Sequence, residues 1–486
     1  MKNLIKVGLL SAFTVVTLTS CDSADDSPGN GSSTGLVKLQ AHSKTASYLK
    51  LDPAFSNLNI YPLLSSEDKL INTPDFVYGS LADGAGLLKN ADDTFTLINN
   101  IEGDYSIARI TLDETFKPVG GEYILNAEAT AYTAQCSGSL ITPAEHGFGP
   151  MYLSGGEWGG ASKGVFATDP FREASSASFA NMLSAFGQWS TENAVVIGKD
   201  AYPDKTVAFI GDDHGDNETP SGQLGMYVGN RGDLYGGNLF GLRVLDTDIN
   251  YEMDMAEGES YPIDFVKLEE TEISMLDAEA KAKGVMGFSR LEDIDWRKGS
   301  PENNRVIYFC VTGRKKDGLA GKGTFYGRVY RVTLNKDNPS GEGTITCVLD
   351  GDLPNGKAKS FHSPDNIVVT ENYAYIQEDP NGYFDNPDKT HYARLYQYDL
   401  NTRSLKTVLE CDQESAAIAG IGNITSPWEI TGMIDVSDTV GLDGTFLVIT
   451  QNHGWNNPGF TDPKAIDPSV ANSEGSQMYI IQGLDR

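Results

Sequence analysis

The feature that most constrains the fold is a strand unit that occurs three times in the second half of the chain. Each copy begins with a run of β-branched and aromatic residues, and Tyr308, Tyr375 and Leu447 occupy equivalent positions 67 and then 72 residues apart. Repetition at this period, with turn residues between strands, predicts β-propeller blades enlarged by loops. The first strands are 305–309, 373–377 and 445–449, the second are 327–332, 394–400 and 478–481, and third strands follow at 345–349 and 405–409.

Other segments of the chain agree with an all-β fold. A β-sandwich would contain the same strands, but it would not explain the period. Helical patterns are few, and the better ones, 176–186 and 270–283, lie between strand regions. We therefore expect a β-propeller with loop and short helical insertions.

The N-terminus is typical of an exported lipoprotein. Lys2 and Lys6 precede an apolar run, 7–18, and small residues lead to Cys21. We expect residues 1–20 to be a signal peptide, Cys21 to carry the lipid, and 21–35 to form a flexible tether. One domain, 36–486, would follow, held in the cell envelope at the outer membrane or facing the periplasm, with exposure at the cell surface left open.

The charge of the chain restricts its partners. Lys and Arg number 37 and Asp and Glu 67, which gives a formal net charge of −30. Such a surface disfavours nucleic acid and anionic membranes, so that the membrane contact would be the lipid anchor alone. Four cysteines follow Cys21 without zinc-like spacing, and the six histidines form no HExxH motif. Carboxylates dominate the possible ligands, which favours hard cations.

Acidic residues gather where the predicted strands end. In a propeller, such segments converge on the central channel, and cations relieve the repulsion between carboxylates that meet there. These segments are 155–158, 191–193, 211–216, 290–292, 363–366, 377–379 and 428–432.

The order of these segments resembles the PhoX-type alkaline phosphatases, over about residues 136 to 454. No single match is specific, but the order is. The matched motifs are Cys136 with Thr142-Pro143, Gly155-Gly156-Glu157, Thr168-Asp169-Pro170, Thr191-Glu192, Gly211-Asp212-Asp213, Arg290-Leu291-Glu292, Ser363-Pro364-Asp365-Asn366, Gln377-Glu378-Asp379, Glu429-Ile430-Thr431-Gly432 and Gln451-Asn452-His453.

The resemblance implies a six-bladed propeller with an iron and calcium cluster that hydrolyses small phosphate monoesters. Cys136 resembles the iron-ligating cysteine, and Arg290 resembles the arginine that meets the substrate phosphate, for which a planar guanidinium is suited. Metal ions would neutralise the phosphoryl charge and supply an activated nucleophile. We expect a monomer. By resemblance, Glu157, Glu192 and Glu292 are metal ligands, and Glu378, Asp379 and Glu429 are candidate calcium ligands.

The sequence also departs from this family and leaves alternatives open. Gly156 stands where an acid is usual, and Thr191 where a histidine is usual. The residues Asp212, Asp213 and Asp216 form either a calcium loop or an acidic turn, because the full EF-hand pattern is missing. Two other functions remain: a non-catalytic, calcium-stabilised propeller that binds a glycan or protein, and a hydrolase of another ester such as a lactone or phytate.

Overall fold

The computed structural model describes residues 37–380 and 386–486, and Val37–Arg486 form one unit. Cys21 and the tether lie outside the described residues, so that lipidation stays a prediction. In the described part of the chain, no helix is long and apolar enough to cross a membrane.

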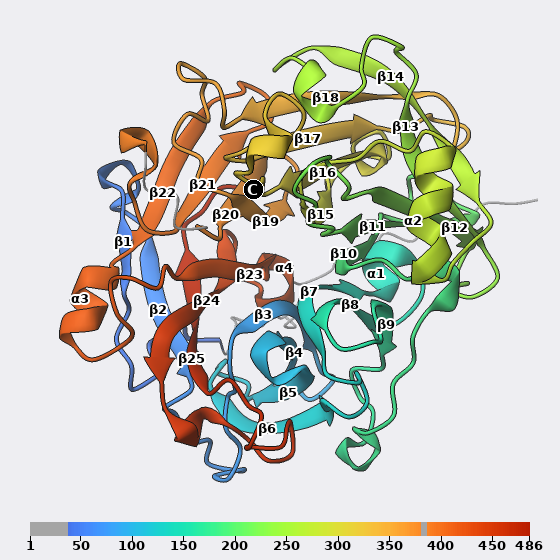
Figure 1. The fold of residues 1–486 in the computed structure, drawn as a ribbon. Coiled ribbons are helices and arrows are strands. Elements are labelled where there is room, and N and C mark those ends of the chain that lie inside the picture. Colours follow the sequence, from blue (N-terminus) through green and yellow to red (C-terminus); the bar gives the residue numbers. More distant parts are fainter. Residues whose placement is uncertain (1–36, 381–385) are drawn as a thin grey trace, which may run out of the picture. The chain divides into compact units, whose positions relative to one another are not determined.

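Sheets arranged around a centre make up the fold, as a propeller requires (Figure 1). Two sheets come from the first third of the chain. One has the order β3-β4-β5-β6 and the other β7-β8-β9. Their strands are β3 (Ala82–Lys89), β4 (Phe95–Ile101), β5 (Ser106–Leu112), β6 (Pro118–Leu125), β7 (Thr133–Ile141), β8 (Met151–Gly159) and β9 (Gly164–Thr168).

The middle of the chain forms a nine-stranded sheet. It consists of two antiparallel series that are joined because β14 pairs with β18. The first series is β10 (Thr191–Val196), β11 (Lys205–Asp212), β12 (Leu224–Asn230), β13 (Asn238–Val244) and β14 (Ser260–Leu268), and the second is β15 (Leu291–Trp296), β16 (Val306–Val311), β17 (Arg328–Thr333) and β18 (Gly343–Asp350).

Two further sheets are completed by strands from the N-terminal end. One has the order β1-β22-β21-β20-β19 and the other β2-β25-β24-β23. Their strands are β1 (Leu49–Leu51), β2 (Asn59–Ser65), β19 (Pro364–Val369), β20 (Tyr373–Glu378), β21 (Arg394–Asp399), β22 (Leu405–Cys411), β23 (Glu429–Asp435), β24 (Thr445–Asn456) and β25 (Glu474–Gln482).

The propeller is confirmed, but the described strands form five hydrogen-bonded sheets rather than six separate blades. The β14–β18 pairing causes this difference, because it fuses two strand series into one sheet. The strands nevertheless form six antiparallel series. The first strand of each series lies at the centre of the ring and contacts the first strand of the next. These first strands are β3, β7, β10, β15, β19 and β23, with β23 returning to β3.

The threefold repeat seen in the sequence corresponds to equivalent strands. Tyr308, Tyr375 and Leu447 lie on β16, β20 and β24, the second strand of each series. In each case the partner is the third strand: Tyr308 pairs with Arg331, Tyr375 with Gln397, and Leu447 with Ile480. The period therefore identified a real structural unit.

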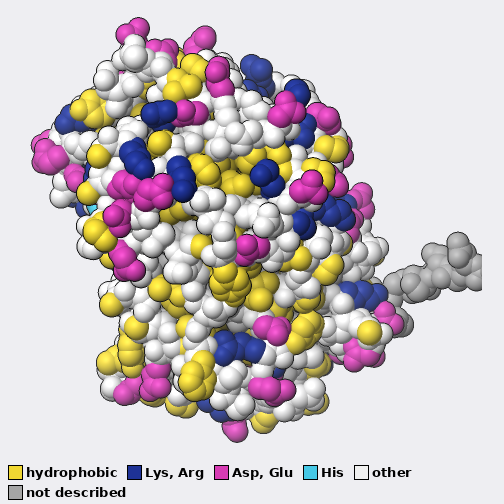
Figure 2. Space-filling model, turned by 90° about the vertical axis from the view of Figure 1, so that its right-hand side faces the viewer, with side chains coloured by type: hydrophobic (Ala, Val, Ile, Leu, Met, Phe, Trp, Pro, Cys, Tyr) yellow, Lys and Arg dark blue, Asp and Glu magenta, His cyan; other side chains and the backbone are white. Residues whose placement is uncertain are grey.

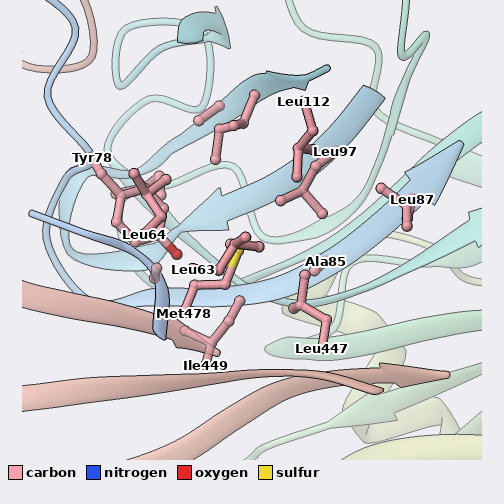
Figure 3. Packing of buried hydrophobic residues seen from close by; sticks show 14 of the residues in the cluster. Leu63, Leu64, Tyr78, Ala85, Leu87, Leu97, Leu112, Leu447, Ile449 and Met478 are labelled. Carbon is pink, nitrogen blue, oxygen red and sulfur yellow. The ribbon is translucent and has the colours of Figure 1, made fainter. Parts of the chain in front are cut away.

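Packing between neighbouring sheets explains why the strands are so apolar. Figure 3 shows Leu97 and Leu112 of the β3–β6 sheet facing Leu447, Ile449 and Met478 of β24 and β25. These side chains are at most 2% exposed and belong to one buried cluster. Burying this area on both sides of each sheet is the main favourable term that holds the ring together.

The sequence predicted one helix correctly and one wrongly. The pattern at 270–283 corresponds to α2 (Ile273–Ala282); the other α-helices are α1 (Pro143–His146), α3 (Gln413–Ile418) and α4 (Ser437–Val440). Residues 176–186 form no α-helix. Their backbone instead pairs with the edge of β9, where Leu183 N donates to Val165 O and Ala167 N donates to Asn181 O, each at 2.8 Å.

The surface carries charges of both signs. On the face at the right of Figure 1, Lys and Arg side chains stand among Asp and Glu side chains (Figure 2). A further group of acids lies at the centre of the ring, on the strands that contact one another there.

Candidate functional site

Every first strand of the ring carries one acidic or thiol side chain to the same cavity. This regularity arises because strands that surround a centre bring their equivalent ends together. The six residues are Asp83 on β3, Cys136 on β7, Glu192 on β10, Glu292 on β15, Asp365 on β19 and Glu429 on β23.

Irregular backbone at the start of these strands aims the side chains. The pairing register shifts just after Thr191, Leu291 and Pro364, each of which immediately precedes an acid. β-Bulges of this kind redirect side chains and are frequent beside active sites. Two residues before the acid, Arg290 (φ 69°) and Ser363 (φ 65°) adopt the left-handed conformation. The same turn therefore recurs around the ring.

The cavity has a volume of about 410 Å³ and a strongly acidic wall. Arg290 and His453 bring basic side chains to it, and Trp158, Gln451 and Asn472 also line it. Its carboxylic acids are Asp83, Glu102, Glu157, Glu192, Glu292, Asp365, Asp379, Glu429 and Glu474.

Three groups of these side chains lie close enough to share a cation. In each group, one ligand atom from every residue lies within 4.8 Å of the others. Because Cys136 and Glu192 each belong to two groups, the three groups form a continuous row across the cavity. They are Asp83, Glu102 and Cys136; Cys136, Glu157 and Glu192; and Glu192, Glu292 and Asp365.

Hydrogen bonds fix the ligand-type side chains in place. The Cys136 thiol donates to Glu157 Oε2 at 3.1 Å. Glu192 Oε1 accepts from the Ser137 hydroxyl at 2.7 Å and from the backbone N of Ser137 at 3.2 Å. Glu102 accepts from Gln451 Nε2 at 2.6 Å and from Trp158 Nε1 at 2.7 Å. Such preorganisation is what a metal or catalytic site needs.

A polar layer lies beneath the acids. Asn366 Nδ2 donates to Ser137 Oγ at 2.6 Å, which links β19 to β7. Asn193 donates to Asp293, whose Oδ2 accepts from Ile367 N at 3.0 Å. Each of these polar residues directly follows a residue of the acid and thiol ring, so that one short segment supplies both the wall and the layer below it.

The protonation of the cavity reflects burial and crowding. Burial, and then the charges of Glu102 and Asp213, raise the pKa of Glu192 to about 8, although the Ser137 hydrogen bond opposes this. Burial together with nearby carboxylates also raises the pKa values of Cys136 and Glu292 well above their usual values. A cation would favour the charged forms of these groups.

The side chains present fit bound metal ions. Glu292 Oε1 is buried and accepts no hydrogen bond from any described residue, although Arg290 Nη2 lies 3.0 Å away. Buried polar atoms usually have partners, and an exception calls for an explanation such as an ion. Carboxylate oxygens suit hard cations, and the Cys136 thiol beside them suits a transition metal.

Arg290 is held at the edge of this row by Asp213. Its Nε donates to Asp213 Oδ1 at 2.9 Å, and its Nη2 donates to Oδ2 at 2.9 Å. Burial disfavours the Asp213 carboxylate, but Arg290, together with hydrogen bonds from Glu157 and Glu292, outweighs burial and lowers the pKa of Asp213 below its usual value. The guanidinium thus stays charged, and Nη1 has no hydrogen-bond partner among the described residues.

Six of the seven residues predicted as metal ligands line the cavity, and the seventh lies elsewhere. Cys136, Glu157, Glu192 and Glu292 take part in the close groups, and Asp379 and Glu429 line the wall. Glu378 does not line the cavity. Its carboxylate accepts from His362 N at 2.7 Å and lies 2.9 Å from His391 Nε2. Glu378 therefore lies outside the lining of this cavity, and its role as a calcium ligand stays a prediction.

The three acids of the possible calcium loop bind different partners. Asp212 accepts from Ser190 N at 3.0 Å, whereas Asp213 holds Arg290. Asp216 accepts from Glu218 N at 2.7 Å and from Thr219 N at 3.2 Å, as in an acidic turn. The turn interpretation agrees with these positions, because each carboxylate has a different partner.

The glycine that departs from the family pattern does not face the cavity. A Cβ on Gly156 would lie 2.7 Å from Phe166 Cε2 and 3.0 Å from Ser162 O. Thr191 does not line the cavity either, and its hydroxyl donates to Trp189 O. Neither departure removes a side chain from this wall.

Sequence reasoning missed Asp83, Glu102 and Glu474 and did not select Asp365. A signal was present, because Asp83, Glu192, Glu292 and Asp365 are each followed by a small or polar residue and then an apolar strand. Glu102 and Glu474 have no such pattern. For His453 the sequence indicated only a structural role or a role in supporting other site residues; it lines the cavity, and its Nδ1 lies 3.1 Å from Glu474 Oε2.

Comparison with known proteins gives a fold but no family. No protein-family model matches the chain, and no curated protein matches it. Among solved structures, PhoX of Pseudomonas fluorescens in complex with vanadate, a transition-state analogue, is 15% identical, with a TM-score of 0.63 over 92% of this chain and 98% of that chain. Regucalcin of Agrobacterium tumefaciens, a calcium-binding protein, is 11% identical, with a TM-score of 0.33 over 92% and 98%. The chain thus shares the fold of PhoX.

Proposed function

We propose that this chain is a metal-dependent phosphomonoesterase. The observation that carries the proposal is the juxtaposition of Arg290 with a continuous row of ligand-type side chains in one cavity. Phosphoryl transfer requires charge neutralisation and positioning, and this wall offers both a guanidinium and possible cation sites. The fold shared with PhoX, whose structure holds a transition-state analogue, supports the same function.

Arg290 would bind and orient the phosphate. Asp213 occupies its Nε and Nη2, which leaves Nη1 to donate to a phosphate oxygen. A guanidinium fixed in this way loses little freedom when the substrate binds, so that it positions the ester for attack.

The row of acids and the thiol would hold the metal ions. When bound there, they would neutralise phosphoryl charge and activate a water molecule for attack. Calcium suits the carboxylate groups, and iron suits the position beside Cys136, as the resemblance to the PhoX type implies. Ser137, Gln451 and Trp158 would orient Glu192 and Glu102 as ligands.

The proposed enzyme would act in the cell envelope on small phosphorylated substrates. This location depends on the lipoprotein signal and Cys21 in the sequence. An outward-facing phosphatase would release phosphate from organic esters outside the cytoplasm.

Metal analysis and turnover on one sample test the proposal. The purified full-length chain is analysed by plasma mass spectrometry and assayed on p-nitrophenyl phosphate at alkaline pH with calcium. We expect bound metal and turnover that a chelator abolishes. Cys136→Ala and Glu292→Gln should lose metal and turnover together, and Arg290→Ala should keep metal and lose turnover. Asp216→Asn, which alters a carboxylate in a turn outside the cavity, is the control.

Two outcomes would contradict the proposal. Calcium without turnover in folded, metal-supplemented protein would favour the binding-propeller alternative. Unchanged metal and turnover in Cys136→Ala, Glu292→Gln and Arg290→Ala would refute the site.

A further inference from the structure

Aromatic side chains stand beside the acidic cavity on one side. Trp158 lines the cavity and is 37% exposed, and Tyr132 is 39% exposed. Tyr105 connects them: its ring meets Trp158 edge-on at 5.5 Å between centroids and Tyr132 at 6.0 Å. We call Trp158, Tyr105 and Tyr132 the aromatic rim.

The backbone of this rim is held in an unfavourable conformation. Tyr105, Ala131 and Tyr132 have φ values of 52°, 50° and 58°, in the left-handed region that non-glycine residues rarely adopt. The neighbouring contacts enforce it, because Tyr132 N donates to Ala127 O at 2.8 Å and the Thr130 hydroxyl donates to Tyr105 O at 2.8 Å. Strain of this kind is concentrated at ligand sites, where it positions a side chain.

The side chain of Trp158 offers an apolar ring to a ligand. Its only polar side-chain atom, Nε1, donates to Glu102 Oε1 at 2.7 Å, so that the ring carbons remain for stacking. Folded proteins gain little from leaving an indole ring in water at the wall of a cavity, but a ligand ring can cover it. The same hydrogen bond fixes the indole relative to a carboxylate of the proposed metal site.

We propose that the aromatic rim binds a planar aromatic ring on the alcohol part of the substrate, such as a nucleobase. This inference rests on the proposed phosphatase function, since it assigns the leaving-group side of the same cavity. With the phosphate at Arg290, the remainder of the ester would extend along the wall to Trp158. The acids on this wall disfavour an anionic leaving group, whereas an uncharged ring gains by stacking without a charge.

The test compares two esters that differ only in the ring. Adenosine monophosphate and ribose phosphate, esterified at the same hydroxyl, have the same reacting atoms, so that their kcat/KM ratio measures recognition of the base. We expect a ratio of roughly tenfold in favour of the nucleotide, as stacking of one base contributes. Trp158→Leu should bring the ratio close to one, and Trp158→Phe, which keeps a ring but loses the N–H, should preserve most of it.

Two controls separate stacking from damage to the site. Metal content of the Trp158 variants, measured by plasma mass spectrometry, reports whether Glu102 still functions without its indole partner. Tyr235→Ala removes an exposed tyrosine that does not line the cavity and should leave the ratio unchanged.

A binding measurement distinguishes failure of the rim from failure of the proposed function. Adenosine, which carries no phosphate, should quench tryptophan fluorescence in the wild type but not in Trp158→Phe, which removes the reporting indole. Quenching that depends on Trp158, without turnover of either ester, would support the ring site and overturn the phosphatase function. A wild-type ratio near one, a ratio unchanged in Trp158→Leu with metal retained, or no quenching by adenosine would each overturn the ring site.

Discussion

Arg290 and Asp213 form a two-pronged ion pair at the edge of the candidate metal row, with Nε–Oδ1 and Nη2–Oδ2 distances of 2.9 Å. Asp213 ends up beside Arg290 although 77 residues separate them in the chain. Asp213 directly follows β11 and Arg290 directly precedes β15, so the pair links the two strand series of one sheet. Its role is to hold a charged guanidinium at a fixed position.

Replacing this carboxylate should impair turnover without removing metal. In Asp213→Asn, the guanidinium loses its counter-charge and one of its two anchors. We expect kcat/KM on a phosphate ester to fall by roughly 10²-fold, because a displaced positioning group costs about that much. Steady-state kinetics and metal analysis on the same sample measure this effect. Loss of metal together with activity would instead make Asp213 part of the metal site.

Adding an acid at position 156 should not add a metal. A Cβ there meets Phe166 and Ser162 instead of the cavity. Gly156→Glu should therefore bind no more metal than the wild type and should lower the free energy of unfolding by about 1–3 kcal/mol through overpacking. Gly120→Ala, whose new Cβ would meet no atom closer than 3.7 Å, is the control in denaturant titration. An extra metal ion in Gly156→Glu would contradict the orientation described above.

Stability should depend on pH through Glu252, which is buried outside the cavity. Burial raises the pKa of Glu252 to about 7, although Arg328 and backbone donors oppose this. The folded state therefore binds a proton that the unfolded state releases. The resulting stability is complete below the usual glutamate pKa and is lost as the pH rises through about 7, at roughly 1.4 kcal/mol per pH unit.

Glu252→Gln imitates the protonated side chain and should remove this dependence. Its amide oxygen can still accept from Ser289 N, which lies 2.8 Å from Glu252 Oε1. The comparison is the free energy of unfolding at pH 5 and pH 8 for both proteins. An equal slope in the variant and the wild type would show that Glu252 does not titrate in this range.

Removing metal should destabilise the protein. Carboxylates crowded around Cys136 and Glu192 repel one another unless a cation or protons neutralise them. A ligand at a hundredfold excess over its Kd stabilises a protein by about 2.7 kcal/mol, so a chelator should lower the Tm by several degrees. Differential scanning calorimetry with and without calcium measures this shift. Glu292→Gln should show a smaller shift than the wild type, and an identical shift would argue against this row as the binding site.

The sequence by itself determined the strand pattern and part of the site. The spacing of Tyr308, Tyr375 and Leu447 identified equivalent strands, because side-chain alternation and turn residues are local properties of the chain. The acids Glu192 and Glu292 were selected by resemblance to the PhoX-type phosphatases, and each lies at the start of a strand. Their convergence also followed from the propeller expectation.

Only the tertiary structure decided which neighbouring residues face the cavity. Asp379 lines it, but Glu378 bonds to His362 N and contacts His391. Successive side chains on extended backbone point to opposite sides. A shift of one residue therefore decides which of two neighbouring acids lines the cavity and which makes structural contacts. The tertiary structure also brings distant segments of the chain together. Strand β2 pairs with β25, and Glu102 lies beside Cys136. Such contacts depend on the packing of whole sheets, which no local pattern in the sequence specifies.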